Sequence, residues 1–134
     1  LRIESIRLND VSGNIAVCRR AVDEFASDPL LRCALSGAYS YLSYDLDRAL
    51  MEMEAAVDVA RRTNQFRRQV LYSKARLLRD MKDYSGLERC LLEIMSEPKS
   101  ATADIAKEDD FVRNLPDGAI SAGVLRTYLQ FMIC

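Results

Sequence analysis

Apolar residues recur three and four positions apart along most of the chain, which is the spacing of a helix that buries one face. Ser12-Gly13-Asn14 interrupts this spacing early. Residues 1–9 are too few to separate helix from strand by period, and their context favours a helix. The further helices that the pattern predicts are 15–25, 30–42, 46–62, 65–81, 87–95, a short acidic helix around 104–113, and 119–133. We therefore expect an all-α fold.

Local signals mark the ends of these helices. Asp28 and Pro29 open the helix at residue 30, because aspartate accepts from unpaired backbone N–H groups and proline suits the first helical position. Either Asp45 or Ser43 caps the next helix. Asn64 closes that helix, since asparagine tolerates the left-handed conformation that ends helices.

The same spacing assigns a buried face to each helix, and it places Phe25 and Phe66 in the core. Gly37 and Ala38 lie in the middle of their helix, where small residues let another helix approach closely. The expected core positions include Ile15, Cys18, Val22, Phe25, Ala49, Met53, Ala56, Val57, Ala60, Phe66, Val70, Leu71, Ala75, Leu78, Leu87, Cys90, Leu91, Ile94 and Met95.

Residues 31–95 read as one helical hairpin written twice, at a constant offset of 38 residues. An internal repeat of this length is typical of a helical solenoid. The paired positions are Cys33 and Leu71, Gly37 and Ala75, Leu46 and Tyr84, Ala49 and Leu87, Met53 and Leu91, and Ala56 and Ile94.

These residues resemble the tetratricopeptide repeat family, in which small residues lie where the two helices of a hairpin cross. Gly37, Ala49 and Ala56 fit those places in the first copy, and Ala75 and the segment DYSGLERCL fit in the second. The likeness covers about residues 1–96. The chain departs from the family in its longer period of 38 residues, against about 34, and in the absence of tryptophan. Leu87 and Ile94 also replace small residues.

The resemblance implies antiparallel hairpins stacked as a short right-handed solenoid. An unrelated helix bundle whose hairpins happen to align predicts the same helices and differs in how they stack. We expect a single helical-repeat domain over 1–134, with a partial repeat at 1–28, repeats at 29–64 and 65–96, a linker at 97–118 that can hold a short helix, and a C-terminal apolar capping helix at 119–134.

That last helix is apolar on nearly all sides and needs cover on more than one of them. It either caps this domain or docks elsewhere, so self-association through 119–134 is one expected use of it. The chain opens without a methionine and inside an amphipathic stretch, which suggests a fragment of a longer protein.

Composition narrows the class of protein. A net charge of −1 over 134 residues gives no global field for nucleic acid or a membrane surface. No apolar run approaches the length of a membrane span and no leader opens the chain, so we expect a cytoplasmic protein. Cys18, Cys33, Cys90 and Cys134 form no C-x-x-C pair, and we interpret the first three as small buried hydrophobes of a reducing compartment.

The usual catalytic groups are missing. The chain has no histidine, no nucleophile motif and no glycine-rich phosphate loop, so we expect no enzyme activity, no metal and no cofactor. Glu52 and Glu54 lie two positions apart and do not share a helix face. Glu108, Asp109 and Asp110 are consecutive and indicate a solvated turn.

Charge is unevenly distributed along the chain. Residues 61–82 hold eight basic residues against one acid, Asp80, a local balance of +7. Neutralisation by neighbouring acidic helices explains this simply. An alternative function is nucleic-acid binding through this arginine-rich stretch, which its acidic flanks disfavour.

The resemblance implies a different use, because in that family the first helix of each hairpin lines a concave groove. We therefore expect a protein-interaction scaffold or adaptor that binds a partner protein, or a peptide with a hydrophobic anchor and an acidic group. Tyr41 and Tyr72 can equally be core residues with one hydrogen-bonded hydroxyl. The expected partner-binding residues are Tyr41, Gln69, Tyr72, Arg76 and Arg79.

Overall fold

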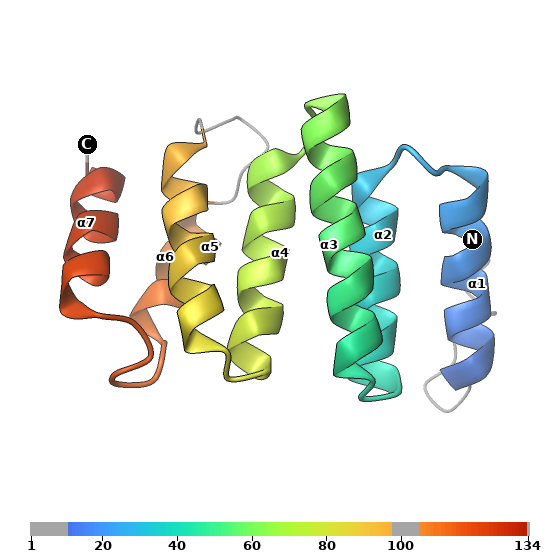
Figure 1. Ribbon diagram of the computed structural model, residues 1–134, viewed down its shortest axis with the longest axis horizontal. Helices are drawn as coiled ribbons and strands as arrows, with labels where there is room; N and C mark the ends of the chain where they lie inside the picture. Colours follow the sequence, from blue (N-terminus) through green and yellow to red (C-terminus); the bar gives the residue numbers. More distant parts are fainter. Residues whose placement is uncertain (1–10, 98–104, 134) are drawn as a thin grey trace. The chain divides into compact units, whose positions relative to one another are not determined.

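The computed structural model describes residues 11–97 and 105–133, and within these ranges it contains helices and no strand. The expected all-α class is confirmed (Figure 1). The predictions for residues 1–9, for the part of the linker over 98–104 and for Cys134 lie outside the described residues. The elements are α1 (Val11–Glu24), α2 (Pro29–Gly37), the π-helix η2 (Ala38–Leu42), α3 (Leu46–Thr63), α4 (Arg67–Asp80), α5 (Tyr84–Ser96), α6 (Ile105–Arg113) and α7 (Ala122–Ile133).

The chain folds as two compact units, divided after Val70 in the first turns of α4. In the N-terminal unit, α2 contacts both α1 and α3 (Figure 1). In the C-terminal unit, the Cys90 thiol of α5 donates to the Leu71 carbonyl oxygen of α4 at 3.1 Å, and α5 also contacts α7. The stacking of hairpins into a solenoid and the capping role of 119–134 stay predictions.

The predicted helix ends are confirmed where local chemistry decides them. The Asp28 carboxylate accepts from the Leu30 N–H at 3.0 Å, with Pro29 at the start of α2. Asp45, rather than Ser43, caps α3 by accepting from the Arg48 N–H at 3.2 Å. Asn64 ends α3 with a left-handed φ of 54°. These ends are set by residues at most four positions apart, which is why sequence alone identifies them.

Helices α3 and α5 bury the stripes that their spacing predicts. Deleting a large side chain from such a core costs about 2–5 kcal/mol. The members of these stripes that are buried in the structure are Ala49, Met53, Ala56, Val57 and Ala60 in α3, and Leu87, Cys90, Leu91, Ile94 and Met95 in α5.

Three predictions about the core are wrong. Ser12-Gly13-Asn14 does not interrupt the chain, because α1 already begins at Val11 and buries Asn14. Phe25 lies just past the end of α1 and is 55% exposed. Phe66 precedes α4 with a positive φ of 56°, which turns the chain and leaves its side chain 39% exposed.

The helix predicted over 30–42 is also not uniform. At Ala38 it widens into η2, and the Tyr39 carbonyl oxygen accepts from the Asp45 N–H at 2.9 Å and from the Ser43 hydroxyl at 2.8 Å. The prediction that Gly37 sits at a close helix crossing is not supported, since the nearest described atom to an added Cβ would be Tyr41 Cδ2 at 3.9 Å.

The offset of 38 residues extends through three pairs of helices. Helices α2, α4 and α6 begin at 29, 67 and 105, and helices α3, α5 and α7 begin at 46, 84 and 122. The internal repeat seen in the sequence at residues 31–95 covers only the first two pairs. The third pair consists of the short helix predicted within the linker, now α6, and the predicted C-terminal helix, now α7, whose pairing was not predicted.

The turns before the second helices repeat at the same offset. Asp45, Asp83 and Ser121 each accept, through a side-chain oxygen, from the N–H three residues later. Tyr44 and Lys82, directly before the first two of these caps, both have left-handed φ angles, of 55° and 59°. A short left-handed step followed by a capping oxygen is thus a recurring joint in this chain.

Candidate functional site

One face of α4 carries three of the predicted partner-binding residues. Tyr72, Arg76 and Arg79 follow at intervals of four and three residues, so they share a side of the helix. The adjoining side of the helix holds buried Ala75 and Leu71, whose carbonyl oxygen accepts from Cys90 of α5. The face that carries Tyr72, Arg76 and Arg79 therefore lies beside the side that packs on α5.

Helix α6 lies along this face and contacts it through an aromatic pair. The rings of Tyr72 and Phe111 meet edge to face, with centroids 5.6 Å apart. The Tyr72 hydroxyl donates to the Lys107 carbonyl oxygen at 3.4 Å. Phe111 is 6% exposed, so its ring is part of the packed interior of this unit. Tyr72 is half-buried, and its hydroxyl takes part in this hydrogen bond.

Both arginines lie over aromatic rings. The Arg79 guanidinium carbon is 5.0 Å from the Phe111 centroid, and that of Arg76 is 5.9 Å from the Tyr72 centroid. Arg79 also donates from Nε and Nη2 to one carboxylate oxygen of Asp80, at 3.1 and 3.0 Å. Arg76 is exposed and pairs with no carboxylate among the described residues. Its charge is therefore the one on this face that stays available.

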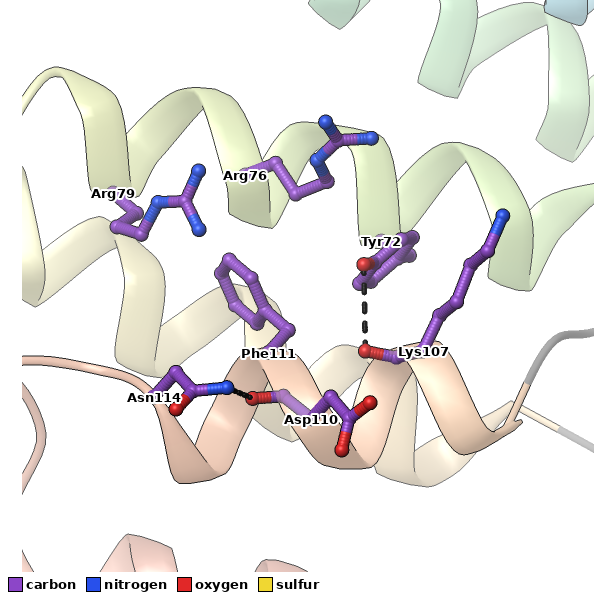
Figure 2. Close-up of a pocket in the computed structure, with 7 residues that line it drawn as sticks. All are labelled: Tyr72, Arg76, Arg79, Lys107, Asp110, Phe111 and Asn114. Atoms are coloured by element: carbon purple, nitrogen blue, oxygen red, sulfur yellow. Dashed lines mark hydrogen bonds between the residues drawn. The ribbon is translucent and has the colours of Figure 1, made fainter.

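An open hollow of about 410 Å³ lies beside this contact and is lined by residues of both helices. In Figure 2 the arginines and Tyr72 stand on α4, Lys107, Asp110 and Phe111 stand on α6, and Asn114 directly follows α6. The lining carries three cationic side chains and one carboxylate, that of Asp110. Asn114 donates its amide hydrogen to the Asp110 carbonyl oxygen at 2.8 Å, which leaves its side-chain oxygen as an acceptor.

The structure brings together only part of the predicted set. Tyr72, Arg76 and Arg79 line the hollow. Tyr41 and Gln69 belong to the N-terminal unit and do not line it. Tyr41 is 57% exposed in η2, so it is not a core residue, and Gln69 is half-buried in the first turn of α4. Their roles in binding stay predictions.

Four lining residues in or directly after α6 were missed, because the sequence did not show that this helix packs on α4. Glu108, Asp109 and Asp110 do not form a solvated turn: they lie within this helix, and Glu108 is buried at 3% exposure. The available signal was the apolar pair Phe111 and Val112, three and four positions after Glu108, which marks a buried helix face. The missed residues are Lys107, Asp110, Phe111 and Asn114.

A second charged cluster lies in the N-terminal unit and joins its three α-helices. Glu52 of α3 accepts from Arg19 of α1 at 2.6 Å and lies 3.8 Å from Arg32 of α2. Hydrogen bonds to Tyr39 and then to Glu52 raise the pKa of Arg19 above its ordinary value. The carboxylate is already held by two guanidinium groups, so this cluster fastens helices and offers no open site.

The arginine-rich stretch 61–82 is not a uniform basic surface. Arg68 is buried at 2% exposure, Arg62 pairs with Asp58 at 3.0 Å, and Arg79 pairs with Asp80. Two of its arginines are thus paired with carboxylates of their own helices, and the predicted neutralisation by neighbouring helices stays a prediction.

Neither metal nor membrane features are found in the described ranges. No three side chains of the metal-binding types gather there into a site that could hold an ion. No helix between residues 11–97 or 105–133 combines the length and apolarity needed to cross a membrane. Cys18, Cys33 and Cys90 are free thiols. All three were expected to be buried; Cys90 is, whereas Cys18 and Cys33 are only half-buried.

Comparisons with protein-family models, with curated proteins and with solved structures find no match to this chain.

Proposed function

We propose that this chain is a non-catalytic protein-interaction module that binds a carboxylate-bearing segment of a partner protein in the hollow between α4 and α6. The observation that carries the proposal is the Arg76 guanidinium, which faces an open, aromatic-lined hollow without an ion-pair partner among the described residues. Arginine binds carboxylates through two parallel hydrogen bonds, and an aromatic ring behind it restricts its motion.

The position of the hollow supports the same function. Its lining from α4 and α6 includes positions one repeat offset apart: Tyr72 and Asp110, and Arg76 and Asn114. These are the positions on the first helix of each hairpin that the tetratricopeptide resemblance assigns to a groove. A ligand lying along them would contact successive hairpins, which is how a repeat scaffold reads an extended segment.

The chain itself fills part of the apolar surface that a ligand could use. Phe111 packs on Tyr72 and under Arg79, so a hydrophobic anchor of the partner meets the rim of this pair and no deep pocket. We infer that charge contributes more to recognition than apolar burial does. Binding should then weaken with salt, because exposed charges are screened.

A spectroscopic titration tests the proposal. The probe is the peptide N-acetyl-Phe-Glu-Glu-amide, followed by ¹⁵N-¹H correlation spectra of the labelled chain, with N-acetyl-Phe-Gln-Gln-amide as the uncharged control. We expect the acidic peptide to shift amide signals in 72–79 and 107–114, and Arg76→Ala to remove most of this effect. Arg61→Ala, an exposed arginine outside the hollow, is the matched control variant and should change nothing. Equal shifts by both peptides would show that the hollow does not recognise carboxylates.

Two other proposals receive less support. Nucleic-acid binding through 61–82 loses Arg68 to burial and has Arg62 and Arg79 already paired. A steep salt dependence of oligonucleotide binding would revive it. Self-association through 119–134 competes with the contact that α7 makes with α5, and sedimentation at several concentrations would reveal it. The thiols at 18, 33 and 90 fit a cytoplasmic site of action.

A further inference from the structure

The two walls of the hollow differ in charge and hydrogen-bonding character. On α4, Arg76 and Arg79 offer only donors. On α6, exposed Asp110 and the side-chain oxygen of Asn114 offer acceptors. Acceptors on α6 have no use in a site that binds carboxylates alone, since they would repel that ligand. The donors on one wall and the acceptors on the other therefore indicate that the ligand carries a hydrogen-bond donor as well as a carboxylate.

Asp110 forms no ion pair with any residue that the structure describes. Arg113, three positions after Asp110 on the same helix, donates instead to Asp109 at 2.8 Å, and Asp110 contributes only a weaker electrostatic influence on it. No ion pair links Asp110 to Arg76 or to Arg79, whose carboxylate partner is Asp80. The Arg76 guanidinium and the Asp110 carboxylate thus line the same hollow and form no ion pair with each other.

The hollow is large enough to keep them apart and to admit a ligand between them. Its volume of about 410 Å³ falls in the range of sites that hold small ligands or a few side chains. A ligand group with one sign of charge would pair with the charge on one wall and would leave the charge on the other wall without a partner in the ligand. A ligand with both signs would satisfy both.

We propose that the partner segment carries an acidic and a basic side chain close together, the acidic one directed to Arg76 and the basic one to Asp110. This inference rests on the proposed function and adds the second charge to it. Lys107, on the same wall as Asp110, keeps that wall from favouring ligands that are only basic. The hollow then selects a mixed-charge segment over a purely acidic one.

The test compares two peptides that differ in one charge. The probes are N-acetyl-Glu-Gly-Lys-amide and N-acetyl-Glu-Gly-Gln-amide, titrated into the labelled 134-residue chain and followed by amide shifts in 72–79 and 107–114. We expect the lysine peptide to bind about 2- to 5-fold more tightly than the glutamine peptide, as for an exposed ion pair. Asp110→Asn should reduce that ratio to about one. Asp109→Asn, which removes a carboxylate committed to Arg113, should leave it unchanged.

Each outcome separates the inference from the function on which it rests. A ratio near one in the unaltered protein, with both peptides still sensitive to Arg76→Ala, would overturn the inference and leave the carboxylate site standing. A ratio that survives Asp110→Asn would likewise overturn it, because the lysine would then be recognised elsewhere. If the peptides shift the amide signals equally in the Arg76→Ala variant, or shift none in the unaltered protein, the proposed function is overturned and this inference with it.

Discussion

The ring of Tyr72 on α4 meets the ring of Phe111 on α6 edge to face, at an interplanar angle of 82°. This geometry places the positive edge of one ring against the negative face of the other, which adds about 0.5–1.5 kcal/mol to the burial of the rings. The pair fixes the position of α6 on α4 and thereby the width of the hollow beside it.

Replacing Phe111 by alanine should therefore destabilise the C-terminal unit by about 3–5 kcal/mol, because a buried phenylalanine leaves a cavity. Urea unfolding followed by circular dichroism measures this loss. Leu92→Ala, at a position that is 47% exposed on α5, is the control and should cost far less. Equal losses in the two variants would mean that Phe111 is not a core residue.

The ion pair between Arg19 and Glu52 should show a measurable coupling. Single and double alanine variants form a cycle, and we expect a coupling free energy of about 1 kcal/mol, kept small because the Arg19 side chain is 41% exposed. Added salt should reduce it. The pair of Arg62 and Asp58, in which both side chains are 68% exposed, should give about 0.3–0.5 kcal/mol. A larger coupling there than at Glu52 would contradict this ranking.

Asp83 should contribute as a helix cap. Its carboxylate accepts from the Gly86 N–H at 3.0 Å, and Asp83→Ala should reduce stability by about 1 kcal/mol through loss of that bond. Thermal unfolding measures the change. Ser85→Ala, at the exposed second residue of the same helix, is the control and should be neutral or slightly stabilising. No difference between the two variants would refute a capping role.

Two glycines near helix starts should respond differently to alanine. Glycine to alanine inside a helix usually gains about 1 kcal/mol. Gly123 should show this gain, since no described atom lies within 4 Å of an added Cβ. Gly86 should not, because its Cβ would come within 2.7 Å of an Asp83 carboxylate oxygen and displace the cap. Unfolding midpoints of the two variants test this, and a full gain at Gly86 would show that Asp83 moves freely.

Burial raises the pKa of the Cys18 thiol above its ordinary value. The thiolate is the reactive form, so alkylation of Cys18 by iodoacetamide should begin at higher pH in the folded protein than in urea. Mass spectrometry of its tryptic peptide follows this residue alone. The Cys18 thiol has a higher pKa in the folded protein than in the unfolded one. Its contribution to folding stability is therefore complete below the unfolded pKa and is lost as the pH rises through the folded pKa. Identical alkylation profiles in the two states would contradict the shift.

Sequence reasoning succeeded where neighbouring residues decide the outcome. The caps Asp28, Asp45 and Asn64 depend on atoms a few positions away, and the buried stripes of α3 and α5 depend on helical period. It failed where packing between distant segments decides. Nothing near Phe66 announces that a left-handed turn leaves its ring exposed.

The candidate site divides in the same way. Tyr72, Arg76 and Arg79 could be predicted, because helical spacing puts them on one face and the tetratricopeptide resemblance points to that face. The short acidic helix that becomes α6 could also be predicted, but its packing on α4 could not, because the consecutive acids at 108–110 gave no sign that Glu108 is buried with Phe111 and Val112. Which helix covers which is a property of the assembled unit, and a single sequence states it weakly.

The left-handed residues Tyr44 and Lys82, each followed by an aspartate cap, have a kinetic consequence. Both joints are made from atoms within four positions of one another, so a hairpin can turn and begin its second helix before any remote segment arrives. Contacts of low sequence separation form quickly, and proteins dominated by them fold in microseconds to milliseconds. Each hairpin can therefore act as its own nucleus during synthesis, with the helices downstream assembling on a turn that already exists.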